Sequence, residues 1–469
     1  MNRLVGHIIA FVALFLVLLA TLAWAEANGF VASRVTTLWA KAIIEVDGAS
    51  TFNATDAFFP PLPFMLTIAL QWLTGGTSVP TPFLISAGLG TLTLIMWFGS
   101  LRFNGGVSAF TSYLAVALLA LNPFFLRSLA DGPENILTMI GTWIFARGII
   151  NLRLTGNAPD MMKVAVGLLI VSMSNSYGVL ICLGAMPFMI VAARPSMLVA
   201  SSTGYLIAMF YPVVAAALSL LFVSKIFNSS LVPLLTEDPI EISVWGHIIV
   251  LLGLTPIALV AIFRNIFIMR YFMPLIASFA TILSAYFLNT FFHVEADPAL
   301  AIAPMLAVVA VAIRHWPKFS LREPIIISLL ALGLLLSTFS FRVGPEGETS
   351  AWVAAMQGKK LVNANLTKDV VTFLATKDGI LVDIERNPEI VPAIGDMQKL
   401  IVSGQTVYDW ALEGGILRAN YVLVQNSANL AVVTDRILRR YPELLTDQLV
   451  QYKEVFQNAR WRVFERTKP

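Results

Sequence analysis

The sequence predicts an α-helical polytopic membrane protein with about 11 transmembrane helices, followed by a C-terminal soluble α/β domain. Of 469 residues, 57% are hydrophobic and only 13% charged, about half the charged fraction of a soluble protein. The apolar residues come in stretches of about 20, the length that spans a hydrocarbon core. The last 128 positions hold 31 of the 59 charged side chains. We therefore expect a membrane bundle over residues 1–341 and a soluble domain over residues 342–469.

The first apolar segment has two interpretations. Arg3 precedes an apolar run from Ile8 to Ala25, and Ala23-Trp24-Ala25 resembles a signal-peptide cleavage site. A signal peptide has an apolar core of about 7–15 residues, however, and this run is longer. We favour an uncleaved first transmembrane helix.

Eleven apolar runs are long enough to cross a membrane, or nearly so. They lie at residues 5–25, 82–100, 107–122, 135–150, 164–178, 179–193, 198–224, 245–263, 266–290, 299–313 and 323–341. The shorter run Leu62–Leu73 follows Pro60-Pro61-Leu62-Pro63 and ends at Gly75-Gly76. We interpret it as an interfacial or re-entrant helix, because it is too short to cross.

The positive charges of the bundle define its orientation. Assigning alternate loops to opposite sides places 11 of the bundle's 15 Lys and Arg residues on one side, which the positive-inside rule makes cytoplasmic. The other side receives only Arg34, Lys41, Arg127 and Lys225. The sequence thus predicts a multi-pass inner (cytoplasmic) membrane protein whose C-terminal domain is extracytoplasmic.

The acidic residues of the bundle have the opposite distribution. Eleven fall on the outer side, and only Asp160 and Glu323 on the inner side. Carboxylates gathered over an apolar bundle suggest catalysis or a cation site there, although ordinary solvated loops also carry such charges. The net charge of +3 gives no reason to expect nucleic acid binding, and the single Cys182 cannot form an intramolecular disulfide.

The C-terminal segment is predicted to form alternating β and α elements. Ile380–Asp383 and Tyr421–Gln425 are short buried-strand runs, and residues 432–440 are helical before Pro442. Residues 449–455 and Trp461–Phe464 flank Gln457-Asn458, which is typical of a hairpin. No phosphate loop, metal-spaced His/Cys cluster or nucleophile motif is present, so this domain lacks a catalytic motif of its own.

Three outer segments carry the candidate site residues. The first outer loop, residues 26–61, is longer than a plain connection needs and contains Glu26, Asp47 and Asp56. Loops of this length are usually functional or disordered. Asp131 and Glu134 stand before the apolar run that starts at Ile136, where a helix dipole favours carboxylates.

Arg127 precedes Asp131 by four residues, so it can hold Asp131 ionised or bind a phosphate. The third segment is the tight outer loop His293–Pro298, which contains an imidazole, Glu295 and Asp297. Helix capping, a structural ion pair and a solvated surface loop are the alternatives for these residues. No cofactor motif is present, and a divalent metal at the outer acids is left open.

This arrangement resembles the GT-C glycosyltransferases, with the lipid A aminoarabinose transferases and the protein O-mannosyltransferases as the nearest comparisons. The resemblance covers essentially the whole chain in order. It comprises the first helix, the long acidic loop ending in Pro60-Pro61-Leu62, the acidic loop around Asp131, many spans and an outward α/β tail. The tail's Tyr421-Val422-Leu423-Val424, Tyr441-Pro442 and Trp461–Phe464 are similar to endings of such bacterial proteins.

The resemblance implies transfer of a sugar from a polyprenyl-phosphate donor to a lipid, glycan or protein acceptor on the extracytoplasmic face, as part of the cell envelope. It implies a general base from the first loop (Glu26, Asp47 or Asp56) with Asp131 as the acid of the second loop. Arg127, Glu134, His293 and Glu295 are then candidates for substrate binding. The first loop departs from the family pattern, because Ala25-Glu26-Ala27 stands where the family has Asp-Glu.

Two other function classes remain open. A secondary transporter or flippase would use carboxylates as cation sites, but transporters place these near the bilayer midplane and show internal repeats. The acids here lie at predicted span ends, and the sequence shows no repeat. A catalytically inactive GT-C-like scaffold is favoured only by the missing Asp-Glu pair.

Reporter fusions test the predicted topology. Fusions after Arg102, Lys163, Arg194, Arg270 and Arg322 should report the cytoplasm, and fusions after Asp56, Asp238 and Pro345 should report the outside. A cytoplasmic C-terminal domain would refute the charge argument and would place the acidic loops on the wrong side for a lipid-linked donor.

Overall fold

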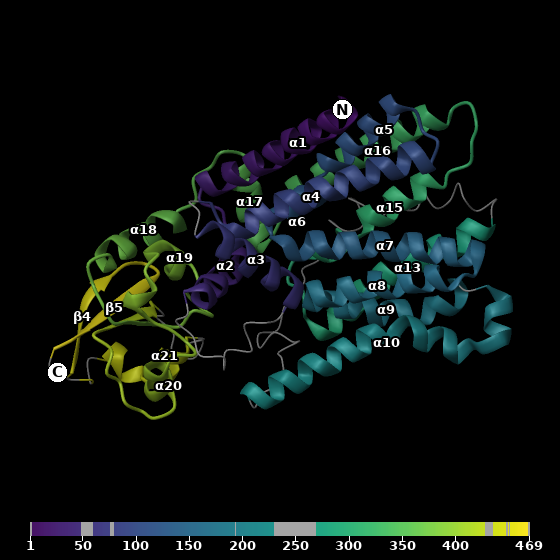
Figure 1. Ribbon diagram of the computed structural model, residues 1–469. Coiled ribbons are helices and arrows are strands. Elements are labelled where there is room, and N and C mark those ends of the chain that lie inside the picture. Colours follow the sequence, from purple (N-terminus) through teal and green to yellow (C-terminus); the bar gives the residue numbers. More distant parts are fainter. Residues whose placement is uncertain are drawn as a thin grey trace.

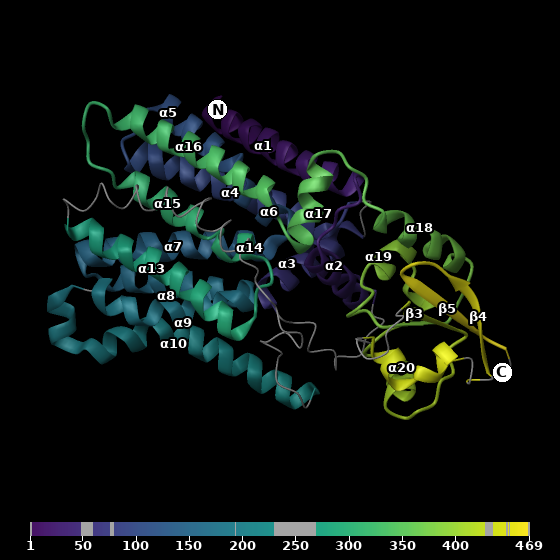
Figure 2. The same ribbon diagram turned by 180° about the vertical axis from the view of Figure 1, so that it is seen from behind.

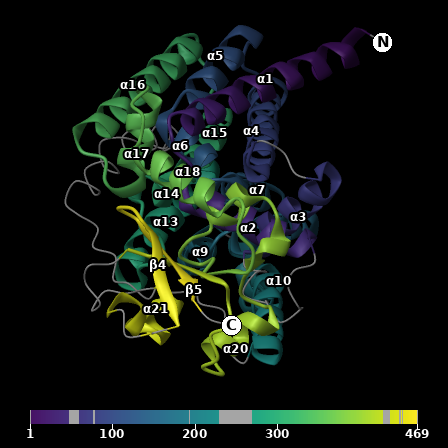
Figure 3. The ribbon, with the colours of Figure 1, turned by 90° about the vertical axis from the view of Figure 1, so that its left-hand side faces the viewer.

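The computed structural model shows a helical bundle with a small sheet domain at one end (Figure 1). It describes residues 2–47, 60–75, 79–192, 194–228, 269–426, 435–446, 449 and 451–467. The N-terminus lies at the end of the bundle away from the sheet (Figures 1 and 2). Viewed from the end that carries the sheet, strands β4 (Tyr452–Gln457) and β5 (Trp461–Arg466) lie in front of the helices (Figure 3).

The helical part contains helices of very different length. Its elements are α1 (Asn2–Ala27), α2 (Ser33–Val46), α3 (Pro61–Thr74), α4 (Thr81–Gly99), η2 (Ser100–Asn104), α5 (Ala109–Ala120), α6 (Pro123–Ala130), α7 (Pro133–Thr155), α8 (Ala158–Ser174), α9 (Ser176–Ala192), α10 (Pro195–Asn228), α13 (Met269–Phe292), α14 (Pro298–Ile302), α15 (Met305–Arg314), α16 (Arg322–Val343) and α17 (Gly347–Met356).

Five helical segments of the described part are long and apolar enough to cross a membrane. They are Ile8–Ala27, Thr81–Asn104, Pro133–Thr155, Tyr271–Phe292 and Arg322–Val343. The pair α5 and α6 adds a sixth if its 57° bend is counted within one span. The run at 245–263 lies outside the described residues, so eleven spans remain a prediction.

Helix α7 lies at the centre of the bundle, with 83% of its most apolar window buried. It packs closely on α8 because glycines line the contact. A Cβ added at Gly141 would meet the Gly167 carbonyl oxygen at 2.9 Å, and one added at Gly148 would meet the Val164 main-chain nitrogen at 3.1 Å. This packing fixes the position of the N-terminal turn of α7, which carries Glu134 and Asn135.

The long first outer loop is largely helical in its described part. Helix α2 is amphipathic and buries Ala40, Ile43 and Ile44 in a hydrophobic cluster of the sheet domain. Helix α3 follows residues 48–59, which lie outside the described residues and include the predicted site residue Asp56. It ends at Gly75, whose φ of 65° is the left-handed conformation that glycine adopts readily at a helix end. Its interfacial placement remains a prediction.

The soluble segment folds around a five-stranded mixed sheet with the order β2-β1-β3-β5-β4. The strands predicted at 380–383 and 421–425 are confirmed as β1 (Ile380–Val382) and β3 (Tyr421–Gln425), which pair in parallel with Ile380 opposite Tyr421. The predicted hairpin is confirmed as β4 and β5. Sequence analysis missed β2 (Leu400–Ile401), which has only two residues.

Short helices cover this sheet. They are α18 (Asn363–Leu374), α19 (Ile390–Ile394), η4 (Met397–Lys399), α20 (Thr406–Leu412), α21 (Arg436–Arg440) and η6 (Pro442–Thr446). Of the helix predicted at 432–440, the described residues confirm 436–440. Helix α17 connects the two parts of the chain, and its last residue lies against α1, since Trp24 Nε1 donates to the Met356 carbonyl oxygen at 3.4 Å.

Asp435 connects strand β3 to helix α21. Its buried carboxylate accepts hydrogen bonds from Ile437 N (2.9 Å) and Leu438 N (3.3 Å) at the start of α21, and from Gln425 N (3.3 Å) at the end of β3. Asp396 caps η4 in a simpler way, because it is exposed and accepts only from Gln398 N (3.1 Å).

The two caps provide a matched comparison. We expect Asp435→Ala to destabilise the sheet domain by about 2 kcal/mol, because it removes a cap and leaves a buried main-chain donor without an acceptor. Asp396→Ala should cost less, about 0.5 kcal/mol. Hydrogen exchange of the peptide that contains β3, measured on the full chain, reports both changes. Equal exchange in the two variants would contradict the assignment.

Candidate functional site

Asp131 is held at the turn between α6 and α7. Gly132 follows with a φ of 108°, a conformation that favours glycine, and Pro133 starts α7. The Asp131 side chain is 2% exposed. Its Oδ1 accepts from Arg127 Nη1 at 3.0 Å, and its Oδ2 accepts from Arg34 Nη1 at 3.2 Å and from Asn135 Nδ2 at 2.7 Å. One carboxylate therefore links α2, α6 and α7.

Arg34, in the first turn of α2, gathers three acids from different segments. Its guanidinium lies 3.2 Å from Asp131, 4.0 Å from Glu134 and 2.7 Å from Glu295. Burial would lower the pKa of Arg34, but Glu295 and Asp131 outweigh it and hold that pKa well above its usual range. With 26% of its side chain exposed, against 1% for Arg127, Arg34 is the more exposed of the two arginines.

Arg127 is buried and surrounded by partners. Its side chain is 1% exposed, and besides Asp131 it contacts Asp297 at 3.2 Å and Glu348 at 3.5 Å. Nε donates to Thr349 Oγ1 at 2.8 Å, and the guanidinium lies over the Phe30 ring. Arg127 therefore joins α6 to α17 and to the loop before α14, and no accessible edge is left for a ligand.

The loop 293–298 is folded by Asn289 of α13. Asn289 Oδ1 accepts from Val294 N at 3.1 Å and from Glu295 N at 2.8 Å. His293 adopts a left-handed φ of 51° at this turn, which is uncommon outside glycine. Asp297 caps α14 by accepting from Ala299 N at 3.0 Å, and Thr349 donates a hydrogen bond to it. The loop thus directs Glu295 and Asp297 at the two arginines.

Together these side chains form one ion network at the end of the bundle nearest the sheet domain. It contains the carboxylates of Asp131, Glu134, Glu295, Asp297 and Glu348 and the guanidinium groups of Arg34 and Arg127. Five carboxylates face two cations, so the network has an excess of acid. Burial raises the pKa of Asp131 to about 6, although Arg127 and Arg34 oppose the shift.

The structure brings together four of the eight predicted site residues, namely Arg127, Asp131, Glu134 and Glu295. Asp47 is exposed at the C-terminal end of α2. His293 is not among the partners of the two arginines given above. Sequence reasoning missed Arg34 and Glu348, and it did not select Asp297. Arg34 could have been identified because it is one of only four basic residues on the predicted outer side of the bundle.

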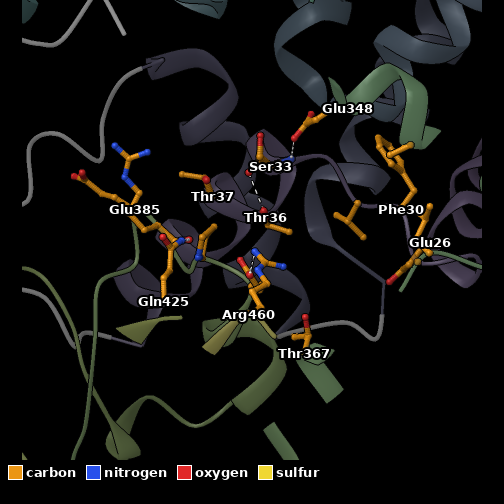
Figure 4. Close-up of a pocket in the computed structure, with 17 residues that line it drawn as sticks. Glu26, Phe30, Ser33, Thr36, Thr37, Glu348, Thr367, Glu385, Gln425 and Arg460 are labelled. Atoms are coloured by element: carbon orange, nitrogen blue, oxygen red, sulfur yellow. Dashed lines mark hydrogen bonds and ion pairs between the residues drawn. The ribbon is translucent and has the colours of Figure 1, made fainter. Parts of the chain in front are cut away.

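A pocket of about 590 Å³ lies beside the network, between α1, α2, α17 and the sheet domain. Ser33, Thr36 and Thr37 line it from one face of α2, while Arg34 between them is directed into the network. Glu26 and Phe30 lie together at one side, and Glu385 and Gln425 at another (Figure 4).

The pocket and the network share residues. Glu348 belongs to both, and its Oε1 accepts from Ser33 N at 2.9 Å, while Phe30 lines the pocket and packs on Arg127 of the network. Within the described residues, the Glu26 carboxylate makes no ion pair or side-chain hydrogen bond. A pocket lined by hydroxyl groups, with a partnerless carboxylate at its wall, can accept a hydroxyl-bearing ligand and remove its proton.

The residues that the structure describes contain no site for a metal ion. No group of three His, Cys, Asp or Glu side chains there is arranged to hold one. The convergent acids Asp131, Glu134 and Glu295 instead surround the Arg34 guanidinium.

Comparisons with known proteins show the fold. No protein-family model matches the chain, and no curated protein matches it in sequence. Among solved structures, it resembles ArnT from Cupriavidus metallidurans bound to undecaprenyl phosphate, with a TM-score of 0.59, 10% sequence identity and 98% of each chain covered. It also resembles the apo state of that protein, with a TM-score of 0.57, 11% identity and the same coverage. The predicted resemblance to a GT-C membrane glycosyltransferase is thus confirmed for the fold.

The raised pKa of Asp131 predicts a pH dependence of stability. The folded state holds a proton on Asp131 up to about pH 6, whereas the unfolded chain releases it near pH 4. The stability contributed by this proton is complete below about pH 4 and is lost as the pH rises to about 6.

Thermal unfolding of detergent-solubilised protein between pH 4 and 6.5 measures this effect. The melting temperature of the wild type minus that of Asp131→Asn should fall across the window and level off above it. A difference that grows with pH would mean that the two arginines lower the pKa of Asp131 instead of burial raising it.

Proposed function

We propose that this protein, which has the fold of the ArnT structures, transfers a sugar from a polyprenyl-phosphate donor to an acceptor hydroxyl at the extracytoplasmic face of the membrane. The observation that carries the proposal is the ion network with one partly exposed arginine, Arg34, beside a pocket that hydroxyl and carboxylate side chains help to line. The solved relative bound to undecaprenyl phosphate supports the choice of a polyprenyl-phosphate lipid.

Arg34 is the group we assign to the donor phosphate. Arg127 has the same chemistry, but it is 1% exposed and its nitrogens contact Asp131, Asp297, Glu348 and Thr349. Arg34 keeps 26% of its side chain exposed, and its shortest contact, 2.7 Å, is with Glu295. A phosphate can replace a carboxylate on a guanidinium, since each offers two oxygens that can accept hydrogen bonds from two N–H donors.

Glu26 is the group we assign as general base. It stands at the C-terminal end of α1 in the wall of the pocket, opposite the hydroxyls of α2. The acceptor hydroxyl gives its proton to Glu26, and its oxygen forms a bond to the anomeric carbon of the sugar. The bond from that carbon to the phosphate oxygen breaks, and the departing phosphate keeps the electron pair and is stabilised by Arg34.

In this proposal, Asp131 is a positioning residue for the two arginines. It is 2% exposed and already accepts three hydrogen bonds, so it has little access to a substrate. Its carboxylate holds Arg34 and Arg127 apart and in place. The acid of the second loop then orients the phosphate-binding cation instead of exchanging a proton with the acceptor.

The sidedness is part of the same proposal. The pocket lies between the bundle and the C-terminal domain, so both face the side that the charge distribution makes extracytoplasmic. A lipid, glycan or protein acceptor enters from that side. A flippase or ion-coupled transporter needs carboxylates near the middle of the membrane, whereas the network lies at the end of the bundle.

Binding experiments test the donor class. Purified protein should bind a polyprenyl-phosphate sugar, because the fold and Arg34 suit a lipid phosphate, and it should not bind a nucleotide sugar, for which the sequence has no motif. Binding measured in detergent with both donors distinguishes them. Tight, lipid-independent binding of a nucleotide sugar would refute the proposal.

Amide variants test the base. Glu26→Gln should lower turnover by roughly 10²–10⁴ while the melting temperature stays near that of the wild type. Asp47→Asn is the matched control, since Asp47 is an exposed acid of the same loop, and it should keep near-normal turnover. Asp56→Asn completes the set of first-loop acids.

Two outcomes would overturn this assignment. Severe loss in Asp56→Asn with normal turnover in Glu26→Gln would move the base to residue 56. Full activity in Glu26→Gln, Asp47→Asn, Asp56→Asn and Asp131→Asn would eliminate the carboxylate mechanism. If the wild type shows no transfer although it binds the donor lipid, the inactive scaffold becomes the better description.

A further inference from the structure

A second group of charged side chains lies at the end of the bundle opposite the sheet domain. Arg314 ends α15 and His315 follows it, while Arg147 lies in the C-terminal half of α7. Helix α15 packs on α7, and the charge of Arg147 acts on both Arg314 and His315, so the three side chains lie at the same end of this helix pair. We refer to Arg147, Arg314 and His315 as the inner basic cluster.

Aromatic and small residues hold the cluster in place. The Arg147 guanidinium lies 5.2 Å from the centre of the Trp143 ring, and the His315 ring lies 5.0 Å from the Tyr271 ring. The main chain before α5 packs directly on the end of α15, since a Cβ added at Gly105 would meet the Arg314 carbonyl oxygen at 3.3 Å.

No acid balances this cluster. Arg314 makes one long hydrogen bond, from Nη1 to Ser100 Oγ at 3.4 Å, and neither Arg314, Arg147 nor His315 forms an ion pair in the described part of the chain. Asp160 is within range of the Arg147 charge, but it accepts from Lys163 Nζ at 2.8 Å and from Thr155 Oγ1 at 2.6 Å.

The other acid at this end is also engaged. Glu323 accepts hydrogen bonds from Ser108 N at 2.8 Å and from Thr111 Oγ1 at 2.6 Å. The nearby cation Lys318, close to Gly106, adds further positive charge. The groups facing the cluster from the neighbouring segments are therefore cations or carboxylates that already have partners.

Orientation in the membrane alone does not explain the burial of these groups. Exposed lysines satisfy the positive-inside rule, yet Nε of Arg314 and Nε2 of His315 are shielded from solvent without a hydrogen-bond partner. Buried donors without acceptors are costly and rare. Arg147 and Arg314 are each partly exposed, so an acceptor from outside the protein can approach this end of the bundle.

The surroundings of the cluster indicate the depth of a lipid headgroup. Phe103, Phe110 and Tyr113 are 78%, 77% and 65% exposed on η2 and α5, beside the segment that contacts Arg314. Exposed aromatic side chains are enriched at the membrane–water interface. An oxyanion at this depth belongs most naturally to a phospholipid.

We propose that Arg147, Arg314 and His315 form a phosphate-binding site that takes the headgroup of an anionic phospholipid from the inner leaflet. The guanidinium groups donate hydrogen bonds to the phosphate oxygens, and the site supplies no carboxylate to compete with them. This site is separate from the proposed transfer site and lies at the other end of the bundle, so the failure of one proposal leaves the other intact.

Native mass spectrometry of the full chain tests the site. The protein is incubated in detergent with phosphatidylglycerol or with phosphatidylcholine of the same acyl chains. The wild type should retain phosphatidylglycerol at least about tenfold better, and the double variant Arg147→Gln/Arg314→Gln should lose this preference. Arg102→Gln, an exposed arginine at the same end that donates to the Val107 carbonyl oxygen, is the matched control and should keep it.

Three results would overturn the proposal. They are equal retention of both lipids by the wild type, an unchanged preference in the folded double variant, and loss of bound lipid in millimolar inorganic phosphate, which would identify free phosphate as the ligand. Arg314→Lys is a second test in case the double variant misfolds, because lysine keeps the positive charge but lacks the guanidinium group. It should retain less phosphatidylglycerol than the wild type, and retention at the wild-type level would also refute the site.

Discussion

The interaction on which the end of the bundle nearest the sheet domain depends is the pairing of the Asp131 carboxylate with two arginines. Through Arg34 it reaches α2 and the loop that carries Glu295, and through Arg127 it reaches α17 and Asp297. These segments are far apart in the sequence, and apolar packing alone would not fix their relative position to within hydrogen-bond distance. The guanidinium groups fix the relative orientation of these segments, because each of them offers N–H donors in a rigid plane.

The two arginines differ in what surrounds them, and this difference is the basis of the functional proposal. Arg127 lies over Phe30 and is hidden from solvent, so its charge is used within the protein. Arg34 lies near the start of an amphipathic helix, and its side chain is partly exposed. An excess of buried carboxylate around it keeps the guanidinium charged and in one position before any ligand arrives. On our proposal, a phosphate then displaces Glu295 without requiring the site to reorganise.

Much of the fold could be predicted from the sequence, because the signals were strong and local. Long apolar runs gave the helices of the bundle, and alternating β-rich segments gave β1, β3 and the hairpin of β4 and β5. The two-residue β2 carries no such signal, since it exists only through its pairing with β1. The number of spans could not be settled by hydropathy, because α8, α9 and α15 are shorter than a membrane is thick.

Only part of the site could be predicted from the sequence, because some of its contacts are local and others are not. Asp131 and Arg127 are four residues apart on one helical turn, so their pairing could be expected from spacing. The contributions of Arg34, Asp297 and Glu348 depend on tertiary contacts between separate segments, which no local pattern encodes. The chain also distributes its polar chemistry between both ends of the bundle. The end nearest the sheet domain has an excess of acid, whereas the opposite end has arginines that form no ion pair among the residues the structure describes.

The central claim is that Arg34 is the partly exposed cation that receives the donor phosphate. The most direct measurement is a density map of the full chain with added undecaprenyl phosphate. The account predicts phosphate density within hydrogen-bond distance of the Arg34 guanidinium, with the Glu295 carboxylate moved away and the Arg127 contacts unchanged. Phosphate density away from Arg34, with the contact between Arg34 and Glu295 intact, would contradict it.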